Sequence, residues 1–320
     1  MVNHNVNNIL IKRLYTFFIL LFPLISGAQK NPIELGDVHW MRSMEEAQAK
    51  SKSENKIILI LFQEIPGCQT CQQYGTEVLS HPLIAETIEN YFVPLAIYNN
   101  KGGEDAEVLK RYNEPAWNNP VVRAVDLYGK DVAVRLSGNY SAAGLASWMS
   151  KVLISNKGRA PQYLQLLTDE LMAGQRKTAK ATYTMYCFWT GEALFGRING
   201  VIRTTAGYQE GKEAVTVEYD PSIISKAELD KVAQGQKCNL TEPGAFRPDD
   251  TPKYYLSNSP FKVVPMTELQ KCRVNSALAE GQDPTELLSK RQLAFLQTNK
   301  KNVVGMSLTE AWTEASKSKG

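Results

Sequence analysis

The sequence has few of the residues from which metal and cofactor sites are most often built. It contains five cysteines and only three histidines, His4, His39 and His81, which lie far apart in the chain. No group of Cys and His residues has the spacing of a zinc site. A catalytic histidine would have to be His39 or His81, and neither belongs to a recognisable motif. We therefore expect no metal and no cofactor.

The chain also lacks a large surplus of charge of either sign. It has 320 residues, with 36 Lys and Arg against 33 Asp and Glu, so its formal charge is +3. This balance gives no electrostatic basis for binding nucleic acid or an anionic membrane surface. Hydrophobic residues make up 43% of the sequence, and the length allows two domains of ordinary size, each with its own core.

The N-terminal segment has the three parts of a secretory signal peptide. Lys12 and Arg13 form the charged part, residues 15–25 the apolar part, and residues 26–28 the small-residue cleavage site. The apolar part is too short to span a membrane comfortably, and no cysteine follows it as a bacterial lipid anchor would require. We expect cleavage after residue 28 and export to the periplasm or the extracellular space. No stable membrane insertion is expected after cleavage.

Residues 36–154 show the pattern of an α/β domain. The run from Lys56 to Phe62 is almost continuously apolar, as a strand buried on both faces requires. The predicted elements are a helix, two strands, a hairpin and a helix, at residues 43–53, 56–62, 91–97, 121–136 and 142–153. A short polar stretch at residues 155–159 is a plausible linker to a second domain.

Two cysteines, Cys68 and Cys71, come directly after the first of these strands and precede a helix-like segment. A Cys-x-x-Cys pair in that position is typical of a redox dithiol. A structural disulfide is an alternative in an exported protein. Half of a zinc site is another alternative, although no second cysteine pair exists to complete it.

This order of strand, dithiol, helix, strand, hairpin and helix resembles the thioredoxin-like family. Asn119-Pro120, just before a predicted strand, falls where that family places a cis-proline opposite the dithiol. The resemblance implies that Cys68, at the start of the helix, attacks first and that Cys71, one turn later, resolves the mixed disulfide. The dipeptide between the two cysteines is Gln-Thr here, where the family usually has Gly-Pro.

Residues 160–280 contain a second cysteine with a distinct environment. Cys187 ends an alternating run over residues 181–186, and Phe188 and Trp189 follow it at once. An apolar pattern of helical spacing then begins. This placement directs the thiol to a helix N-terminus, where the macrodipole and free N–H groups favour a thiolate.

The motifs after Cys187 form an ordered series. They are Cys-Phe-Trp-x-x-Glu-x-Leu-Phe, Gly-Val, Ala-Gly-Tyr, Glu-Ala-Val and Tyr-Asp-Pro, between residues 187 and 221. The series resembles the peptide methionine sulfoxide reductases specific for the S epimer, and the likeness covers roughly residues 180–280. It implies an α+β fold, with Cys187 as the nucleophile. Phe188 and Trp189 would form an apolar wall for the methyl group of the substrate.

The same resemblance assigns the polar groups of the site. Glu213 falls where the family has its acid, and a carboxyl group shielded beside aromatic rings retains its proton for donation more readily. Asp250 and Tyr255 match the family's Asp-x-x-x-x-Tyr, with Tyr255 placed to hydrogen-bond the sulfoxide oxygen.

The sequence departs from the family's pattern at two places near Cys187 and Glu213. Tyr186 replaces a glycine, which predicts a narrower approach to Cys187, and only four residues separate Tyr208 from Glu213, where the family has a long loop with another tyrosine.

Two thiols remain as candidates for resolving a sulfenic acid on Cys187. Cys272 lies at helical spacing from Met266 and Leu269, which favours a buried structural residue. Cys238 lies in an irregular segment after a helix predicted over residues 224–232. We predict that Cys238 is the resolving thiol.

The sequence thus predicts an exported α/β protein of two domains, followed at residues 281–320 by one amphipathic helix, over 284–296, and a polar tail. The expected function is thiol-dependent reduction of peptidyl methionine S-sulfoxide. Its partners would be oxidised proteins or peptides and an upstream thiol reductant, with the dithiol re-reducing the second domain. The alternative is a thiol–disulfide oxidoreductase whose second domain is catalytically weak and binds methionine-containing partners. A purely structural protein would not need Cys187 beside two aromatic residues.

Overall fold

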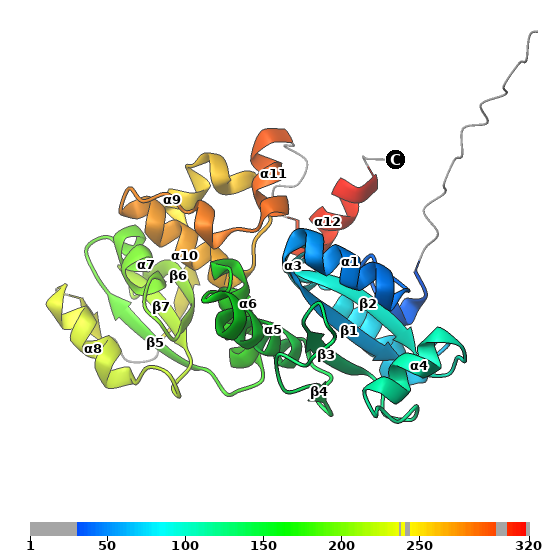
Figure 1. Ribbon diagram of the computed structural model, residues 1–320. Helices are drawn as coiled ribbons and strands as arrows, with labels where there is room; N and C mark the ends of the chain where they lie inside the picture. The colour runs from blue at the N-terminus through cyan, green and yellow to red at the C-terminus, as the bar shows by residue number, and fades with distance from the viewer. Residues whose placement is uncertain (1–30, 237, 241–243, 299–305, 318–320) are drawn as a thin grey trace, which may run out of the picture. The chain divides into compact units, whose positions relative to one another are not determined.

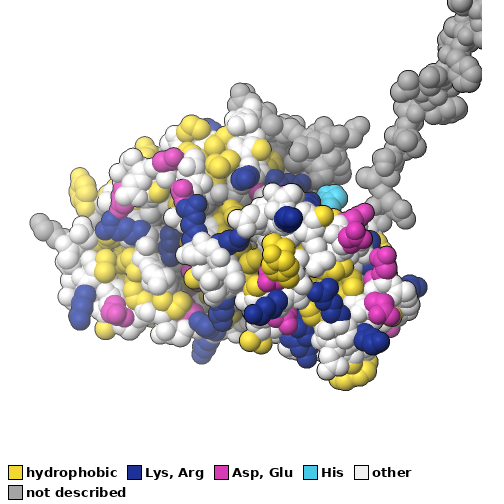
Figure 2. Space-filling view, in the orientation of Figure 1, with side chains coloured by type: hydrophobic (Ala, Val, Ile, Leu, Met, Phe, Trp, Pro, Cys, Tyr) yellow, Lys and Arg dark blue, Asp and Glu magenta, His cyan; other side chains and the backbone are white. Residues whose placement is uncertain are grey.

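The computed structural model describes residues 31–236, 238–240, 244–298 and 306–317. The predicted signal peptide, residues 1–28, lies outside these ranges, so its cleavage stays a prediction. Among the described residues, no helix has the length and apolar character needed to cross a membrane. Lys and Arg side chains are interspersed with Asp and Glu on the face shown in Figure 2, which agrees with the balanced composition.

The first sheet has four strands in the order β2-β1-β3-β4. Its strands are β1 (Ile57–Gln63), β2 (Phe92–Tyr98), β3 (Val121–Val125) and β4 (Leu136–Ser137). β1 runs parallel to β2 and antiparallel to β3. Alternate side chains of β1 enter two different cores, with Leu59 in one and Ile60 in the other. The continuous apolar run therefore folds as predicted, because both faces of the strand are covered.

Helices cover both faces of this sheet, and Figure 1 shows them on either side of the blue-to-cyan strands. Ala47 of α1 and Val108 of α4 belong to the core on one face, and Ile84 of α3 and Leu145 of α5 to the core on the other. The helical segments are a 3-10 turn (Ile33–Leu35), α1 (Met44–Glu54), α2 (Gln69–Gln73), a π-helical turn (Tyr74–Leu79), α3 (Pro82–Tyr91), α4 (Glu104–Arg111) and α5 (Ala142–Lys157).

The polar stretch at residues 155–159 is not a free linker throughout. α5 continues to Lys157 and ends at Gly158, whose φ of 76° is the left-handed conformation that glycine adopts easily. The side chain of Asn156 donates a hydrogen bond to the carbonyl of Val152 at 2.8 Å, and Lys157 Nζ donates to the carbonyl of Asn55 at 2.8 Å. These polar residues form a solvated helix end, which composition alone does not distinguish from a linker.

The second sheet has five strands in the order β8-β5-β7-β6-β9, and every pairing in it is antiparallel. Its strands are β5 (Ala179–Thr184), β6 (Val201–Gln209), β7 (Lys212–Tyr219), β8 (Asn239–Leu240) and β9 (Phe246–Pro248). Glu210 and Gly211 form the turn between β6 and β7, with φ values of 52° and 75°. Two positive φ angles in a two-residue turn produce a tight hairpin, in keeping with the four residues that separate Tyr208 from Glu213 in the sequence.

The helical segments after the first sheet are α6 (Gln162–Gly174), α7 (Phe188–Gly196), α8 (Lys226–Gly235), α9 (Tyr254–Ser257), a 3-10 turn (Pro260–Val263) and α10 (Glu268–Ala279). α7 and α10 pack against β6 and against each other (Figure 1). Phe188 and Phe195 of α7 join Val215 and Val217 of β7 in the core of this sheet. This α-and-β arrangement has the fold class that the sequence predicted.

The C-terminal segment differs from the single predicted helix. It contains a 3-10 turn (Thr285–Leu287), α11 (Lys290–Thr298) and α12 (Leu308–Lys317). α11 begins late because Ser289 caps it: Ser289 Oγ accepts the N–H of Gln292 at 3.2 Å, and Gln292 Oε1 accepts the N–H of Ser289 at 2.9 Å. The boundaries proposed for the two domains stay predictions.

Several later elements complete the core on one face of the first sheet. Leu164 and Leu167 of α6, Phe295 of α11 and Trp312 of α12 all belong to it. At its other end α6 also contacts the second half, since the carboxylate of Glu170 accepts the N–H groups of Glu268 and Leu269 at the start of α10. α6 therefore packs with elements of both sheets.

A buried carboxylate joins α3 to the start of α11. Glu86 is only 1% exposed, and its carboxylate accepts hydrogen bonds from the Ser289 hydroxyl at 2.6 Å and from the Arg291 N–H at 2.9 Å. Burial raises the pKa of Glu86, although these two donors act in the opposite direction. The strength of this connection between α3 and α11 therefore depends on the protonation of Glu86, and hence on pH.

Candidate active site

Cys187 lies at the start of α7, and two residues separate it from Thr184, the last residue of β5. Its backbone is extended, its carbonyl accepts the N–H of Gly191 at 3.1 Å, and the Thr190 hydroxyl donates to its sulfur at 3.4 Å. The side chain is partly exposed. The predicted strand-to-helix position of this thiol is thus present, with a hydroxyl donor that can stabilise a thiolate.

Glu213 is positioned beside Cys187 by the hairpin. It pairs with Tyr208 across the β6–β7 turn, and its main-chain carbonyl accepts the N–H of Met185 at 2.9 Å. Its side-chain Oε2 accepts the N–H of Phe188 at 2.8 Å. This bond anchors the carboxylate at the N-terminus of α7, at the residue that follows Cys187. Its other oxygen has no hydrogen-bond partner among the described residues and is available to a proton.

Five aromatic rings form a continuous row beside the thiol. Phe188, which is 3% exposed, packs edge-on against Tyr208 with ring centres 5.2 Å apart, and lies 5.6 Å from Trp189. Trp189 stacks on Tyr254 at 4.0 Å, and Tyr254 meets Tyr255 edge-on at 5.5 Å. The predicted wall of Phe188 and Trp189 therefore extends to α9. Tyr254 was not predicted to belong to this wall. The two adjacent tyrosines at positions 254 and 255 are the feature of the sequence that could have indicated it.

The indole N–H of Trp189 is a donor without an acceptor. Its nitrogen is buried, and no hydrogen-bond partner for it exists among the described residues. A buried donor left unpaired costs free energy unless a ligand or water supplies the acceptor. This N–H is therefore a group that an acceptor oxygen of a substrate could satisfy.

A buried ion pair joins α7 to the start of α9. Lys253 Nζ donates to Glu192 Oε1 at 2.7 Å, and the main-chain N–H of Lys253 donates to Glu192 Oε2 at 2.9 Å. Lys253 Nζ also donates to the carbonyl of Thr204. Burial alone would lower the pKa of Lys253, but the neighbouring Cys272 and Glu192 outweigh it and raise that pKa, so the ammonium stays charged. Glu192 belongs to the motif that begins at Cys187, but no local pattern in the sequence indicates that Lys253 is its partner.

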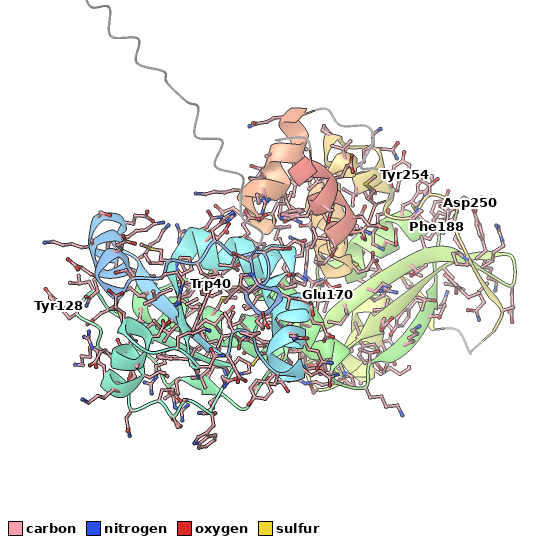
Figure 3. All side chains as sticks on the ribbon, turned by 90° about the vertical axis from the view of Figure 1, so that its right-hand side faces the viewer. Trp40, Tyr128, Glu170, Phe188, Asp250 and Tyr254 are labelled. Carbon is pink, nitrogen blue, oxygen red and sulfur yellow. The ribbon has the colours of Figure 1, made fainter. Side chains whose placement is uncertain are left out.

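Tyr255 and Asp250 differ in how the fold holds them. Tyr255 is partly buried in α9, and its hydroxyl has no hydrogen-bond partner among the described residues. Asp250 is exposed, whereas its neighbour Asp249 forms the turn by accepting the N–H of Thr251 at 3.2 Å. Figure 3 shows Asp250 in the same part of the view as Phe188 and Tyr254. No described residue hydrogen-bonds the Asp250 carboxylate, so its proposed part in the site stays a prediction.

Tyr186 does not narrow the approach to Cys187 in the way expected. Its side chain is 99% exposed and projects into solvent. The preceding residue faces inward instead: Met185 packs against the core of the second sheet, and its sulfur lies so close to Gly191 that a Cβ there would approach it to 1.9 Å. The alternation of the extended chain therefore places Met185 inside and Tyr186 outside.

The two other thiols of this half occupy different environments. Cys238 is buried just before β8, and β8 pairs with the end of β5 through Thr184 and Asn239. Cys238 therefore lies at the same end of β5 as Cys187. Burial raises the pKa of the Cys238 thiol. Cys272 is fully buried in α10, as predicted. All five cysteines are free thiols.

The dithiol lies at the start of α2, with one exposed and one buried thiol. Cys68 and Cys71 have their sulfurs 3.7 Å apart. The Cys71 N–H donates to the Cys68 sulfur and lowers the pKa of Cys68, whereas burial raises the pKa of Cys71 to about 12. Cys71 donates to Asn119 Oδ1 at 2.8 Å, and the Asn119–Pro120 peptide bond is cis. This asymmetry matches the predicted order, in which Cys68 attacks first.

One family model matches a segment of the first half, and two solved structures are similar to part of the chain. Residues 39–126 match the family model described as thioredoxin-like. A thioredoxin from Thermus thermophilus, known from a solution structure, is 25% identical with a TM-score of 0.33, and the match covers 38% of this chain and 92% of that one. DsbH oxidoreductase is 21% identical with a TM-score of 0.32, covering 41% and 92%. Residues 39–126 thus match a thioredoxin-like domain.

Curated relatives point to a second family. A peptide methionine sulfoxide reductase of Drosophila melanogaster is 38% identical over 79 residues, which cover 20% of this chain and 32% of the relative. Peptide methionine sulfoxide reductase A5 of Arabidopsis thaliana is 42% identical over 67 residues, covering 17% and 26%. The chain thus spans a third or less of the length of these relatives. These similarities are consistent with a fusion of the two families.

Proposed function

We propose that this protein reduces methionine S-sulfoxide in proteins and peptides to methionine. The observation that carries the proposal is the bond between Glu213 Oε2 and the N–H of Phe188, which holds a carboxyl group beside the Cys187 thiol. A nucleophile, an acid and an aromatic wall then lie together. The partial similarity to peptide methionine sulfoxide reductases supports the same reaction.

In the proposed first step, the Cys187 thiolate attacks the sulfur of the sulfoxide. Glu213, in its protonated form, gives its proton to the oxygen. The oxygen passes to Cys187, so methionine leaves and Cys187 becomes a sulfenic acid. The sulfoxide gains two electrons, and the thiol loses two. The unpaired indole N–H of Trp189 and the Tyr255 hydroxyl are the donors available to the oxygen.

In the second step, the Cys238 thiol attacks the sulfenic acid and releases water, leaving a Cys187–Cys238 disulfide. The Cys68–Cys71 dithiol then exchanges with that disulfide and becomes oxidised itself. Because the dithiol is part of the same chain, its effective concentration at the second site exceeds that of a separate protein. An upstream thiol reductant restores the dithiol, and the protein acts after export, in the periplasm or the extracellular space.

A second candidate function is thiol–disulfide exchange by the first domain alone, with the second half binding methionine-containing partners. The tight Glu210–Gly211 turn favours it, because this turn contains no tyrosine to stand near Glu213. The retained contact between Glu213 and the start of α7 favours the reductase.

One assay separates the two candidates. The full chain is incubated with a small dithiol and with peptides that carry either the S or the R epimer of methionine sulfoxide. Turnover of the S epimer only is expected, with its loss in Cys187→Ser, because a hydroxyl is a far poorer nucleophile at neutral pH. Cys272→Ser is the matched control and should retain activity. Absence of turnover in the wild-type chain, or full activity in Cys187→Ser, would contradict the proposal.

A further inference from the structure

Three potential ligand atoms meet at the start of α2. One carboxylate oxygen of Glu64 and the sulfurs of Cys68 and Cys71 all lie within 4.8 Å of one another. The two sulfurs are 3.7 Å apart. Thiolates bound to one tetrahedral Zn²⁺ at about 2.3 Å would be about 3.8 Å apart. The dithiol therefore has the spacing of two zinc ligands without rearrangement.

The position of the Glu64 carboxylate is not explained by any contact with the described residues. It follows the last residue of β1 and is partly buried, and its carboxylate forms no hydrogen bond or ion pair with any described residue. A different acid, Glu34, shapes the loop before the dithiol by accepting the N–H of Gly67 at 2.8 Å. The carboxylate of Glu64 is thus left facing the two sulfurs.

We propose that Glu64, Cys68 and Cys71 bind one thiophilic divalent cation, such as Zn²⁺, when the dithiol is reduced. Two thiolates and one carboxylate are a ligand set that suits Zn²⁺. Three protein ligands leave the fourth tetrahedral position open, and the exposure of Cys68 provides access from solvent. The proposal does not depend on the reductase function of the second half.

Metal binding and electron transfer exclude each other at this site. Binding displaces the protons of the two thiols and forms two metal–sulfur bonds. When a partner disulfide accepts two electrons from the dithiol, a Cys68–Cys71 bond forms, both metal–sulfur bonds break and the cation is released. A bound cation therefore retains the electrons in the dithiol, so that metal supply regulates electron donation by this domain.

Cobalt provides a direct probe of the site in the full chain. Reduced protein is titrated with Co²⁺ without oxygen, and thiolate-to-cobalt absorption and the visible bands of tetrahedral Co²⁺ are recorded. One equivalent should bind and be displaced by Zn²⁺, whereas protein with a Cys68–Cys71 disulfide should show neither band. Glu64→Gln should weaken binding by at least about 10-fold, since even residues that only orient a metal ligand usually contribute about 10- to 100-fold to affinity, and Cys68→Ser should abolish the bands.

The controls separate this site from the other thiols and acids. Glu77→Gln changes an exposed acid on the π-helical turn after α2, and Cys187→Ser removes a thiol of the other half; both should bind Co²⁺ like the wild type. Binding unchanged by Glu64→Gln would overturn the site as proposed. A second outcome would also overturn it. If Glu64→Gln changes only the rate at which the metal-free dithiol reacts with a small disulfide, Glu64 is a proton acceptor for the dithiol and not a metal ligand. Near-UV circular dichroism verifies that each variant is folded.

Discussion

Glu192 and Lys253 connect α7 to α9 at two points. One oxygen of the Glu192 carboxylate accepts the ammonium of Lys253 at 2.7 Å, and the other accepts its main-chain N–H at 2.9 Å. Glu192 is fully buried and Lys253 is 6% exposed. Lys253 directly precedes Tyr254, the ring that stacks on Trp189. The pair therefore holds the start of α9, where Tyr254 lies, against α7.

Breaking this pair should destabilise the protein strongly. Lys253→Met leaves the Glu192 carboxylate buried without its cation, which typically costs about 3–5 kcal/mol. Chemical denaturation should show that loss, and the fluorescence of Trp189 should change as Tyr254 moves. Combining Lys253→Met with Glu192→Gln should cost less than the two single changes added together. The control Lys226→Met breaks an exposed pair with Asp230 and should cost less than about 1 kcal/mol. A loss for Lys253→Met no larger than that of the control would contradict the role of the pair.

Removing the acid at position 213 should slow the chemistry and leave the fold intact. In Glu213→Gln, the amide oxygen can still accept the N–H of Phe188, but the side chain no longer supplies a proton. The rate of S-sulfoxide reduction should fall by ~10²–10⁴-fold, the usual contribution of a positioned acid. Glu210→Gln, in the exposed turn next to it, is the matched control. A Glu213→Gln rate near that of the wild type across the pH range would make Glu213 only a strand residue.

The resolving step should accelerate as pH rises. Burial raises the pKa of Cys238, so this thiol is protonated at neutral pH, and only its thiolate attacks the sulfenic acid. Below the pKa, the rate of Cys187–Cys238 disulfide formation should rise about tenfold per pH unit. A single turnover without reductant, followed by peptide mapping, measures it.

The same experiment on variants identifies the resolving thiol. Cys238→Ser should accumulate sulfenic acid at Cys187, whereas Cys272→Ser should form the disulfide normally. A Cys187–Cys272 bridge, or a mixed disulfide formed directly between Cys187 and Cys68, would show that Cys238 does not resolve the intermediate.

The dithiol should matter only for the supply of electrons. Cys68→Ser should leave activity driven by a small dithiol unchanged, because that reductant reaches the second site directly. Activity driven by an upstream protein reductant should be lost, since the entry thiol is missing. Steady-state assays with both reductants measure the difference. Equal loss with both would mean that the two halves do not cooperate in the proposed order.

Glu86 should produce a pH-dependent contribution to stability. Its pKa is raised above the ordinary value of 4.5, so its stabilising contribution is fully present below that value and is lost as pH rises through the raised pKa. Glu86→Gln lacks this dependence, so its stability relative to the wild type should increase as the pH rises above 4.5. Denaturation at several pH values tests this, with Glu45→Gln on exposed α1 as the control. A constant difference between Glu86→Gln and the wild type would contradict the raised pKa.

Parts of the fold that depend on local pattern could be predicted from the sequence. The apolar run of β1 required burial on both faces, and Cys187 stood at a change from strand to helix pattern. The absence of a long loop before Glu213 was visible as the short separation between Tyr208 and Glu213, although the hairpin itself was not predicted. In each case neighbouring residues in the chain carry the signal.

Features that depend on distant residues were not predictable in this way. The Glu192–Lys253 pair and the Trp189–Tyr254 stack join residues some sixty positions apart, and neither partner has a local pattern that reveals the other. The polar end of α5 has the composition of a linker, but it is helical to Lys157, and the N–H of Gly158 donates to the carbonyl of Ile154 at the helix end. Local patterns therefore indicate Cys187 as a candidate but not the distant residues that pack around it.

The position of Trp312 has a consequence for the order of synthesis. This residue of α12 is buried in the same core as Leu59 of β1 and Ile84 of α3. Because the ribosome synthesises the chain from the N-terminus, these earlier residues emerge long before Trp312. Apolar surface that is exposed on a nascent chain promotes aggregation. The core that contains Leu59 and Ile84 is therefore complete only after α12 has been synthesised. A ribosome-bound chain that ends before residue 308 should be more susceptible to protease and bind chaperones more than the released protein.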